Sequence, residues 1–185
     1  MFDRQGNRKY LNGAERRAFA RVAQHEPDAL RRAFALTMFH CGCRISEALN
    51  VTTERVDLAN KAIIFETLKR RRNGLFRAVP IPDSLVELLA QIVPPAAPSE
   101  RVWKFSRPTA YRLVTDYMAR AGIAGGMASP KGLRHGFAVA CLAQKIPLTT
   151  LKKWLGHARL ETTAIYLDVS GNEERELARR LWTNG

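Results

Sequence analysis

The chain has 185 residues, 46% of them hydrophobic and 25% charged, as expected of one globular domain of ordinary size. Lysine and arginine number 30 against 17 aspartate and glutamate residues, which gives a formal net charge of +13 at pH 7. An excess of that size predicts a polyanionic partner, and nucleic acid is the commonest one. No apolar run approaches the roughly 20 residues of a membrane helix. The polar start contains no signal-peptide core, so the sequence predicts a cytoplasmic protein with no membrane partner.

The three cysteines, Cys41, Cys43 and Cys141, cannot all pair with one another. In a reducing compartment they are expected to be buried, small apolar residues. His40 beside Cys41 and Cys43 offers part of a metal site, but zinc needs about four ligands. No second Cys/His pair follows at a workable spacing, so we expect no metal and no cofactor.

The first part of the chain has the pattern of helices. Residues 1–13 are polar and are expected to form a flexible arm. Apolar residues at helical spacing then predict helices over 14–26 and 29–40. Gly42 ends the second helix, and a short helix is predicted over 44–50.

The period then changes to that of short strands. Strands are predicted over residues 56–58, 62–68 and 76–80, with turn residues between them. The turn between the last two strands contains four consecutive cations: Lys69, Arg70, Arg71 and Arg72.

The remainder of the chain is predicted to be helical. Asp83 is expected to cap a helix that ends near Val93, and a proline-rich linker follows. Thr149 and Thr150 are further expected caps. Helices are predicted over 107–121, 131–144, 149–156, 159–167 and 172–182. The fold class is therefore mainly α with a small antiparallel β-sheet (α+β), in one domain over residues 1–185.

Several segments contain residue types that suit chemistry on a phosphodiester. Breaking and resealing such a bond without a metal requires a covalent nucleophile, fixed cations on the non-bridging oxygens and a proton donor for the leaving oxygen. Arginine suits the second task because its planar fork holds phosphate through two hydrogen bonds. The residues of these types are Arg44 with Glu47, Lys69, Lys131 with Arg134, and His157 with Tyr166 nine residues later.

Each of these residues also has an ordinary structural explanation. Arg44 and Glu47 have the spacing of a helix ion pair. The cationic turn could be a solvated hairpin tip, His157 a capping or core histidine, and Tyr166 a half-buried aromatic residue. The four segments together, in their order and spacing, outweigh the separate explanations.

The order Arg-Ile-Ser-Glu-Ala-Leu, a β-hairpin lysine, Leu-Arg-His-x-Phe-Ala, Leu-Gly-His and a later tyrosine resembles the tyrosine recombinase (phage integrase) family. The resemblance extends from Tyr10 to the last predicted helix. It implies the catalytic-domain fold of that family. It also implies a site-specific recombinase or integrase that cuts and rejoins double-stranded DNA through a 3′-phosphotyrosyl intermediate, with no metal and no nucleotide.

The resemblance further implies a role for individual residues. Arg44 and Arg134 would clamp the scissile phosphate, and His157 would donate a hydrogen bond to it. Lys69 would protonate the leaving 5′ oxygen. Tyr166 would be the nucleophile, and we expect the surrounding cations to favour its phenolate.

The remaining positions have supporting roles or depart from the pattern. Glu47 and His135 correspond to residues that support the active site, and Arg70, Arg71 and Arg72 are expected to contact the DNA backbone. Lys131 stands where the family usually has the histidine of His-x-x-Arg. That histidine is assigned to proton transfer around the tyrosine, so the identity of the base is open here.

The resemblance also bears on domains and assembly. Family members usually have a separate N-terminal core-binding domain, and the catalytic pattern here begins almost at Met1, so none is expected. Either a naturally short recombinase or an excised or truncated catalytic domain would explain this. The C-terminal helix, within residues 172–185, is expected either to pack in the same chain or to dock on a neighbour. A homotetramer on DNA and a monomer in solution are expected.

Two other classes of function remain open. Lys131 in place of histidine favours a non-enzymatic DNA-binding protein that has kept the fold. A relaxing DNA topoisomerase would share the chemistry but rejoin the same strand.

Overall fold

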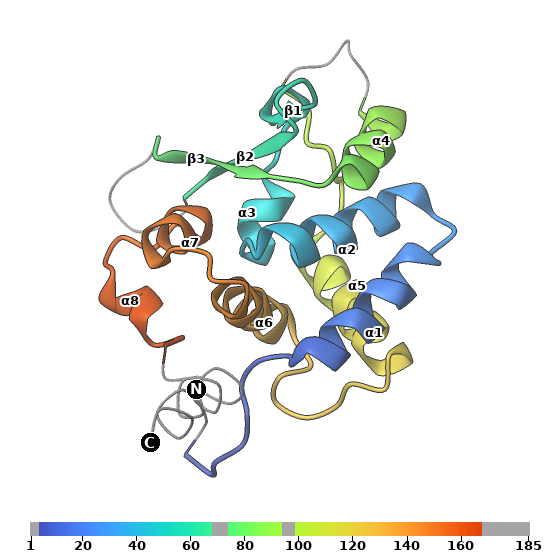
Figure 1. The fold of residues 1–185 in the computed structure, drawn as a ribbon. Helices are drawn as coiled ribbons and strands as arrows, with labels where there is room; N and C mark the ends of the chain where they lie inside the picture. The colour runs from blue at the N-terminus through green and yellow to red at the C-terminus, as the bar shows by residue number, and fades with distance from the viewer. Residues whose placement is uncertain (1–3, 68–73, 94–98, 168–185) are drawn as a thin grey trace.

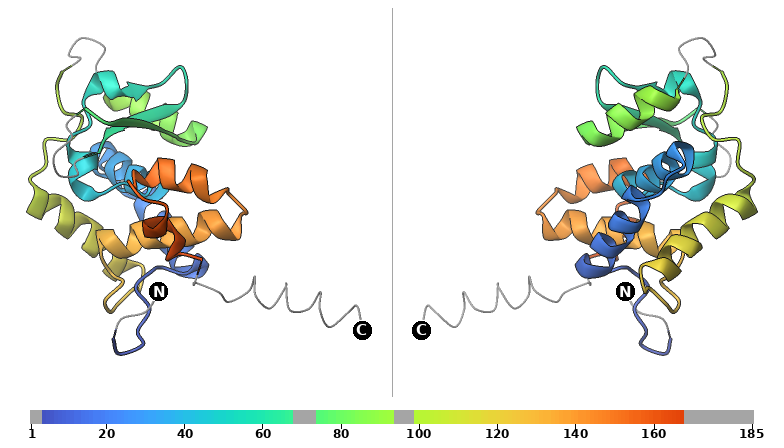
Figure 2. Two further views of the ribbon diagram at one scale, coloured as in Figure 1. Left: turned by 90° about the vertical axis from the view of Figure 1, so that its left-hand side faces the viewer. Right: turned by 90° about the vertical axis from the view of Figure 1, so that its right-hand side faces the viewer.

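The computed structural model describes residues 4–67, 74–93 and 99–167. Figure 1 shows the sheet and α4 at one end of the molecule and α1, α5 and α6 towards the other, and the side views in Figure 2 agree. The described elements in chain order are α1 (Gly13–Gln24), α2 (Ala29–Cys41), α3 (Ile45–Leu49), the 3-10 turn η1 (Thr53–Arg55), β1 (Val56–Asp57), β2 (Ala62–Glu66), β3 (Phe76–Pro80), α4 (Asp83–Ile92), α5 (Arg107–Arg120), α6 (Pro130–Ala143), α7 (Leu148–Leu155) and α8 (Glu161–Ala164). The predicted fold class, mainly α with a small antiparallel sheet, is confirmed.

Helix α2 forms the centre of the core, and it contacts α1, α3, α4, α5 and α6. It is apolar on most sides, as expected of a helix that is surrounded by others. Asp28 caps its N-terminus by accepting hydrogen bonds from the backbone N–H groups of Leu30 and Arg31. Gly42 ends it in the left-handed conformation, with φ of 57°. The prediction of a helix that ends before Gly42 is confirmed.

The three strands form one antiparallel sheet in the order β1-β2-β3. In the β2–β3 register Ile63 lies opposite Val79, and Phe65 lies opposite Arg77. All four of these side chains are buried, so one face of the sheet packs on the molecule. The predicted second strand reached Leu68, which lies outside the described residues together with the cationic turn. Within the described part, the three predicted strands are confirmed.

The predicted helix caps are wrong at three positions. Asp83 is the first residue of α4, after Pro82, and its carboxylate lies 2.8 Å from the Nζ of Lys61. Helix α7 begins at Leu148, and its N-cap residue Pro147 makes no side-chain cap, so Thr149 and Thr150 both lie inside the helix. A proline is the N-cap residue of each of these helices, so the first turn begins one to three residues earlier than a cap at Asp83, Thr149 or Thr150 would place it.

Two serines cap the helices that form the site. Ser106 accepts a hydrogen bond from the backbone N–H of Thr109, and Ser129 accepts one from Gly132. In both cases a proline occupies one of the first helical positions, where its missing N–H costs nothing. These caps fix where α5 and α6 begin.

The predicted flexible arm is wrong at its C-terminal end. Leu11 is fully buried, and its backbone N–H donates to the carbonyl of Gly132. A Cβ on Gly136 would lie 2.8 Å from the backbone oxygen of Leu11. Gly136 therefore lets the arm approach the helix backbone, and the buried Leu11 side chain fixes it there.

The prediction of buried, unpaired cysteines is confirmed, because all three are free and buried. Burial raises the pKa of the Cys43 thiol to about 12 and that of the Cys141 thiol to about 11. Both are therefore protonated at neutral pH and pack as apolar groups. Across the described residues, no helix is long and apolar enough to cross a membrane. The predicted helix over 172–182 lies outside the described residues.

Candidate active site

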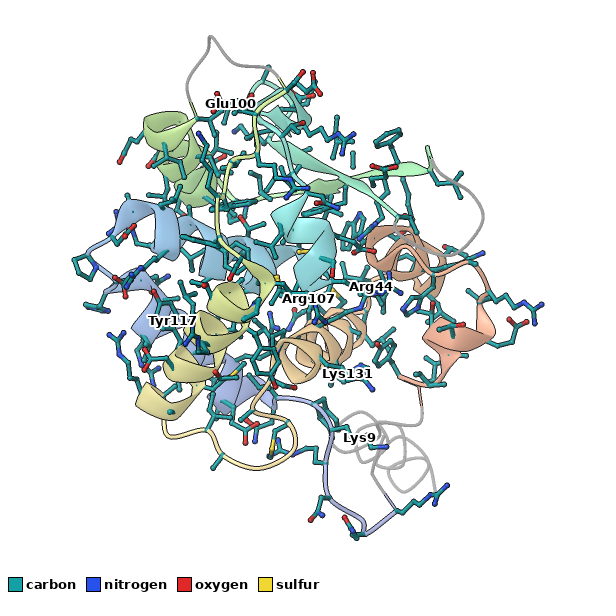
Figure 3. All side chains as sticks on the ribbon, turned by 180° about the vertical axis from the view of Figure 1, so that it is seen from behind. Lys9, Arg44, Glu100, Arg107, Tyr117 and Lys131 are labelled. Atoms are coloured by element: carbon teal, nitrogen blue, oxygen red, sulfur yellow. The ribbon has the colours of Figure 1, made fainter. Side chains whose placement is uncertain are left out.

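A cavity of about 560 Å³ lies where α3, α5 and α6 begin and where the segment from α7 to α8 passes. Six of the predicted site residues line it: Arg44, Lys131, Arg134, His135, His157 and Tyr166. Figure 3 shows Arg44, Arg107 and Lys131 on one face of the molecule, close to the starts of these helices. Lys69, Arg70, Arg71 and Arg72 lie outside the described residues.

Arg134 is held rigidly at the floor of this cavity. Its Nη1 donates to the carbonyl of Gly42 at 2.8 Å, and its Nη2 donates to that of Leu155 at 2.7 Å. These carbonyls lie at the C-terminal ends of α2 and α7, where backbone acceptors lack helical partners and the helix dipole favours a cation. Burial, and then the neighbouring charge of Arg44, lowers the pKa of Arg134 to about 10. The guanidinium thus remains charged at neutral pH.

The buried carboxylate of Glu47 is shared by three arginines of the site. Its carboxylate lies 2.6 Å from Arg44 Nη1, 2.6 Å from Arg77 Nη2 and 3.9 Å from Arg134 Nη1. It also accepts a hydrogen bond from the backbone N–H of Arg44. Burial favours the neutral acid, but the arginines, with Arg77 first, outweigh it and lower the pKa of Glu47. Glu47 is accordingly an ionised support, in agreement with its predicted position beside Arg44.

Arg77 of β3 is a site residue that the sequence reasoning missed. Its side chain is only 4% exposed, and besides Glu47 it donates to the carbonyl of Trp154 at 2.7 Å and to Thr67 Oγ1 at 3.1 Å. A signal was present in the strand, because Arg77 and Val79 are two residues apart and must share a face. An arginine on the buried face of a strand predicts a buried carboxylate partner.

The glycine of Leu-Gly-His leaves room for Arg77. Gly156 adopts a left-handed conformation with φ of 65°, and a Cβ at this position would lie 2.8 Å from Arg77 Nη1. It is followed directly by His157, which enters the cavity. The motif thus brings the end of α7 against the sheet and directs the histidine into the site.

His157 is fixed through both ring nitrogens. Nδ1 lies 2.9 Å from Thr163 Oγ1, and Nε2 lies 3.0 Å from Arg134 Nη2. Because a guanidinium only donates hydrogen bonds, Nε2 is the acceptor, and in the neutral ring the proton lies on Nδ1. His157 can therefore donate to a phosphate from Nε2 only after it gains a second proton.

The hydroxyl of Tyr166 reaches the cavity from a buried side chain. Tyr166 is 2% exposed, and its ring stacks on that of His157 with centroids 6.3 Å apart. Burial raises the pKa of Tyr166, and the opposing effects of Arg134 and Arg44 are smaller. The cations favour the phenolate, as expected, but desolvation outweighs them, so the net pKa of Tyr166 is raised.

His135 lies beside Tyr166, with Nδ1 2.8 Å from the phenolic oxygen. Burial, followed by the charges of Lys131, Arg134 and Lys9, lowers the pKa of His135 to about 4. The imidazole is therefore neutral at pH 7 and supports the tyrosine directly. Contact with the nucleophile was not part of the prediction for His135.

Lys131, Arg107 and Tyr111 complete the cavity wall. Lys131 is exposed on the first turn of α6, one turn before Arg134. Arg107 and Tyr111, from the first turns of α5, were missed by the sequence reasoning, and no local motif marks them. Together these residues give the cavity a cationic rim.

This arrangement brings several cationic side chains and a tyrosine to one cavity, a combination that suits a phosphodiester as ligand. Arg44, Arg134 and Lys131 offer positive charge from three directions, which is what a bound phosphate requires. The hydroxyl of Tyr166 lies in the same cavity.

The chain belongs to the phage integrase family, whose model matches residues 9–173. It is 27% identical over 165 residues to a tyrosine recombinase of Thermosipho africanus, covering 86% of this chain and 57% of that protein. The XerA recombinase structure has the same fold, with a TM-score of 0.76 and 23% identity over 92% of this chain and 64% of that one. The XerH recombinase in a post-cleavage complex with palindromic difH substrate also matches, with a TM-score of 0.72 and 23% identity over 95% of this chain and 54% of that one. The chain spans little more than half the length of the Thermosipho relative.

Proposed function

We propose that this chain is the catalytic domain of a site-specific recombinase that cuts and rejoins double-stranded DNA through a 3′-phosphotyrosyl link. The observation that carries the proposal is the placement of the Tyr166 hydroxyl in one cavity with Arg44 and Arg134. The shared fold with XerH, a recombinase captured with its DNA after cleavage, supports the same chemistry. The net charge of +13 suits DNA as the partner.

The two arginines bind the scissile phosphate and stabilise the charge that builds up on its oxygens. Arg134 is already fixed by the carbonyls of Gly42 and Leu155, and Arg44 is fixed by Glu47. Donors that are in place before the reaction lose little reorganisation energy when charge develops. His157 adds a third donor once it is protonated.

Two transesterifications then conserve the phosphodiester bond energy. The oxygen of Tyr166 attacks phosphorus, the bond to the 5′ oxygen breaks, and Lys69 supplies the proton that this oxygen needs. The 5′-hydroxyl of a partner strand later attacks the phosphotyrosine and releases Tyr166. Lys131 acts as a phosphate ligand at the rim of the cavity.

The decisive test is trapping of the covalent intermediate. The protein is incubated with nicked duplexes built from inverted repeats that border its gene, so that the short 5′ fragment is lost after cleavage. We expect an SDS-resistant protein–DNA adduct that disappears in Tyr166→Phe and persists in Tyr10→Phe, a tyrosine outside the cavity. Absence of an adduct on DNA that the protein footprints would favour a non-enzymatic DNA-binding protein.

A strand-exchange assay separates the recombinase from a topoisomerase. Two differently labelled duplexes that contain the site are mixed with the protein, and a supercoiled plasmid is treated in parallel. Hybrid products are expected for a recombinase. Relaxation without hybrid products would identify a relaxing topoisomerase instead.

Assembly and DNA contacts beyond the cavity are part of the same proposal. Four chains assemble on paired DNA sites, the free protein is monomeric, and the C-terminal helix docks on a neighbour. Arg70, Arg71 and Arg72 contact the DNA backbone. Analytical ultracentrifugation with and without a duplex site tests the change in stoichiometry.

A further inference from the structure

We propose that His135 accepts the phenolic proton of Tyr166 when the tyrosine attacks phosphorus, in a chain that has Lys131 where the family pattern has histidine. The inference rests on the proposed function and deepens it, because it names the group that activates the nucleophile. It makes His135 a catalytic residue instead of a support for Arg134.

Geometry is the first argument. The Nδ1 atom of His135 lies 2.8 Å from the phenolic oxygen, which is within the distance over which a base removes a proton directly. The two rings are tilted by 55°, with centroids 5.6 Å apart. His135 occupies α6, one turn beyond Lys131 and next to Arg134, so the base and the phosphate clamp share one rigid helix.

The state of the imidazole is the second argument. The ring is neutral at pH 7, so one nitrogen has a free lone pair. A phenol is a strong donor, and the sp² nitrogen of imidazole is a strong acceptor, which favours the tautomer in which Nδ1 accepts the Tyr166 proton. The Nε2 atom is buried and has no hydrogen-bond partner among the described residues. In the described part of the chain, the hydrogen bond to Tyr166 is therefore the only one that His135 makes through its ring.

The other groups near the hydroxyl are poorly suited to accept a proton. His157 uses Nε2 to accept from Arg134 and Nδ1 to donate to Thr163, so both of its ring nitrogens are engaged, and its ring stacks on that of Tyr166. Arg44 and Arg134 only donate. Lys131 is exposed on the rim. Among the described residues that line the cavity, His135 combines a free lone pair with contact to the phenol.

The step balances in atoms and charge. The O–H bond of Tyr166 breaks, its proton moves to Nδ1 of His135, and the phenolic oxygen bonds to phosphorus. The bond between phosphorus and the 5′ oxygen breaks, and that oxygen takes a proton from the acid assigned to Lys69. In rejoining, the attacking 5′-hydroxyl gives its proton back to the amine of Lys69, and the imidazolium returns its proton to the departing phenolate, so both groups end in their starting state.

Bound DNA makes His135 a better base. Burial keeps His135 neutral first, followed by the charges of Lys131 and Arg134 on its own helix and Lys9 from the N-terminal segment, and Arg44 lies across the cavity. His157, from the segment after α7, faces the ring of Tyr166. A phosphodiester in the cavity brings a negative charge among these cations and so favours the imidazolium. Proton acceptance is thereby coupled to the arrival of the substrate.

The test compares single-turnover adduct formation on the nicked duplex between pH 6 and 9. With His135 as the base, the wild-type rate does not rise tenfold per pH unit over this range, because the base is a side chain and not hydroxide. In His135→Asn the amide can still accept a hydrogen bond near the Nδ1 position but cannot take a proton. We expect its rate to fall by about 100-fold or more at pH 7 and to rise about tenfold per pH unit, because hydroxide must then remove the proton.

Matched variants assign the effect to the base. Lys131→Gln is expected to react more slowly but with the same pH profile as the wild type. DNA affinity, measured by fluorescence anisotropy, is expected to be unchanged in His135→Asn. The inference would be overturned if the rate of His135→Asn were within threefold of the wild-type rate at pH 7, or if it did not rise with pH. Adduct formation by the wild type would still support the proposed function in that case.

The wild-type profile tests the inference even if the variant does not fold. A tenfold rise per pH unit in the wild type would mean that hydroxide, and no side chain, removes the proton. A rise of the rate with pH that is present in the wild type and lost in Lys131→Gln would identify Lys131 as the base. That result would also overturn the inference. A wild type that forms no adduct would overturn the proposed function and the inference together.

Discussion

At the scale of single residues, the site depends on one buried carboxylate. Glu47 contacts Arg44 and Arg77 directly and faces Arg134, and its side chain has no exposed surface. Removing its charge would leave buried guanidinium groups without a counterion, which typically costs about 3–5 kcal/mol. We expect Glu47→Gln to be destabilised by about that amount in urea unfolding at pH 7. Glu87→Gln, at an exposed position of α4, is the control and should change stability by less than about 0.5 kcal/mol.

The same residue should make stability depend on pH. The pKa of Glu47 is lower in the folded chain than its ordinary value of about 4.3, so the unfolded state binds more protons. The contribution is complete above about pH 5 and is lost as the pH falls through the folded value. Thermal unfolding between pH 7 and pH 3 should therefore show a smaller acid-induced decrease in Glu47→Gln than in the wild type. An equal decrease in both proteins would contradict this.

Sequence reasoning identified most of these residues but few of their contacts. Arg44, Glu47, Arg134, His157 and Tyr166 were found because their order and spacing follow a family pattern. Arg77 could have been found from strand alternation. The contact of His135 with Tyr166 could not, since it joins positions 31 residues apart through the packing of α6 against the chain after α8. Lys69 stays a prediction.

At the scale of elements, the junction of α7 with the sheet depends on a glycine. Gly156→Ala would place a Cβ against the guanidinium of Arg77, which Glu47 and Trp154 hold in place. Gly122 is a matched control, because its φ of 70° resembles the 65° of Gly156 but nothing lies within 4 Å of its added Cβ. Gly122→Ala should cost about 1–2 kcal/mol from left-handed strain alone. We expect Gly156→Ala to cost at least about 1 kcal/mol more in chemical unfolding.

The cationic turn should act on DNA affinity and not on sequence preference. Each phosphate contact contributes about 0.9 to the slope of log affinity against log salt concentration. Replacing Arg70, Arg71 and Arg72 by alanine should lower the magnitude of that slope by up to about 2.7. It should also weaken binding to cognate and random duplexes by the same factor. Fluorescence anisotropy titrations at several salt concentrations measure both. A loss confined to the cognate duplex would show that the turn reads bases.

Element boundaries were predictable to within a few residues because capping and apolar period are local properties of the sequence. The helix predicted over 29–40 is observed at Ala29–Cys41, and the strand predicted over 76–80 at Phe76–Pro80. The prediction was less accurate over 159–167, where the helix is only Glu161–Ala164. There, packing of Thr163 and Tyr166 against α7 and the histidines decides the backbone, and this is a tertiary effect that local pattern does not contain.

At the scale of the whole molecule, stability is unevenly distributed. Helix α2 lies within the larger hydrophobic cluster, whereas Tyr166 belongs to a smaller cluster with α7 and part of α6. Near α8, Leu160, Ile165 and Leu167 are 40%, 41% and 55% exposed. Hydrogen exchange should therefore be fastest near α8 and slowest in α2, with protection that differs by about 100-fold or more. Equal protection in both helices would contradict this order.

Arg134 has a consequence for how such domains lose activity over time. Arg134 donates hydrogen bonds to the carbonyls of Gly42 and Leu155 at the C-terminal ends of α2 and α7. The residue proposed to bind phosphate therefore also stabilises the fold. In a related protein that binds DNA without cutting it, loss of the tyrosine hydroxyl would change the stability of the fold little. Loss of the arginine would destabilise the fold. Among decayed copies of such genes, Tyr166 should be replaced earlier than Arg134, so that a retained arginine reports selection on the fold and a retained tyrosine reports selection on the chemistry.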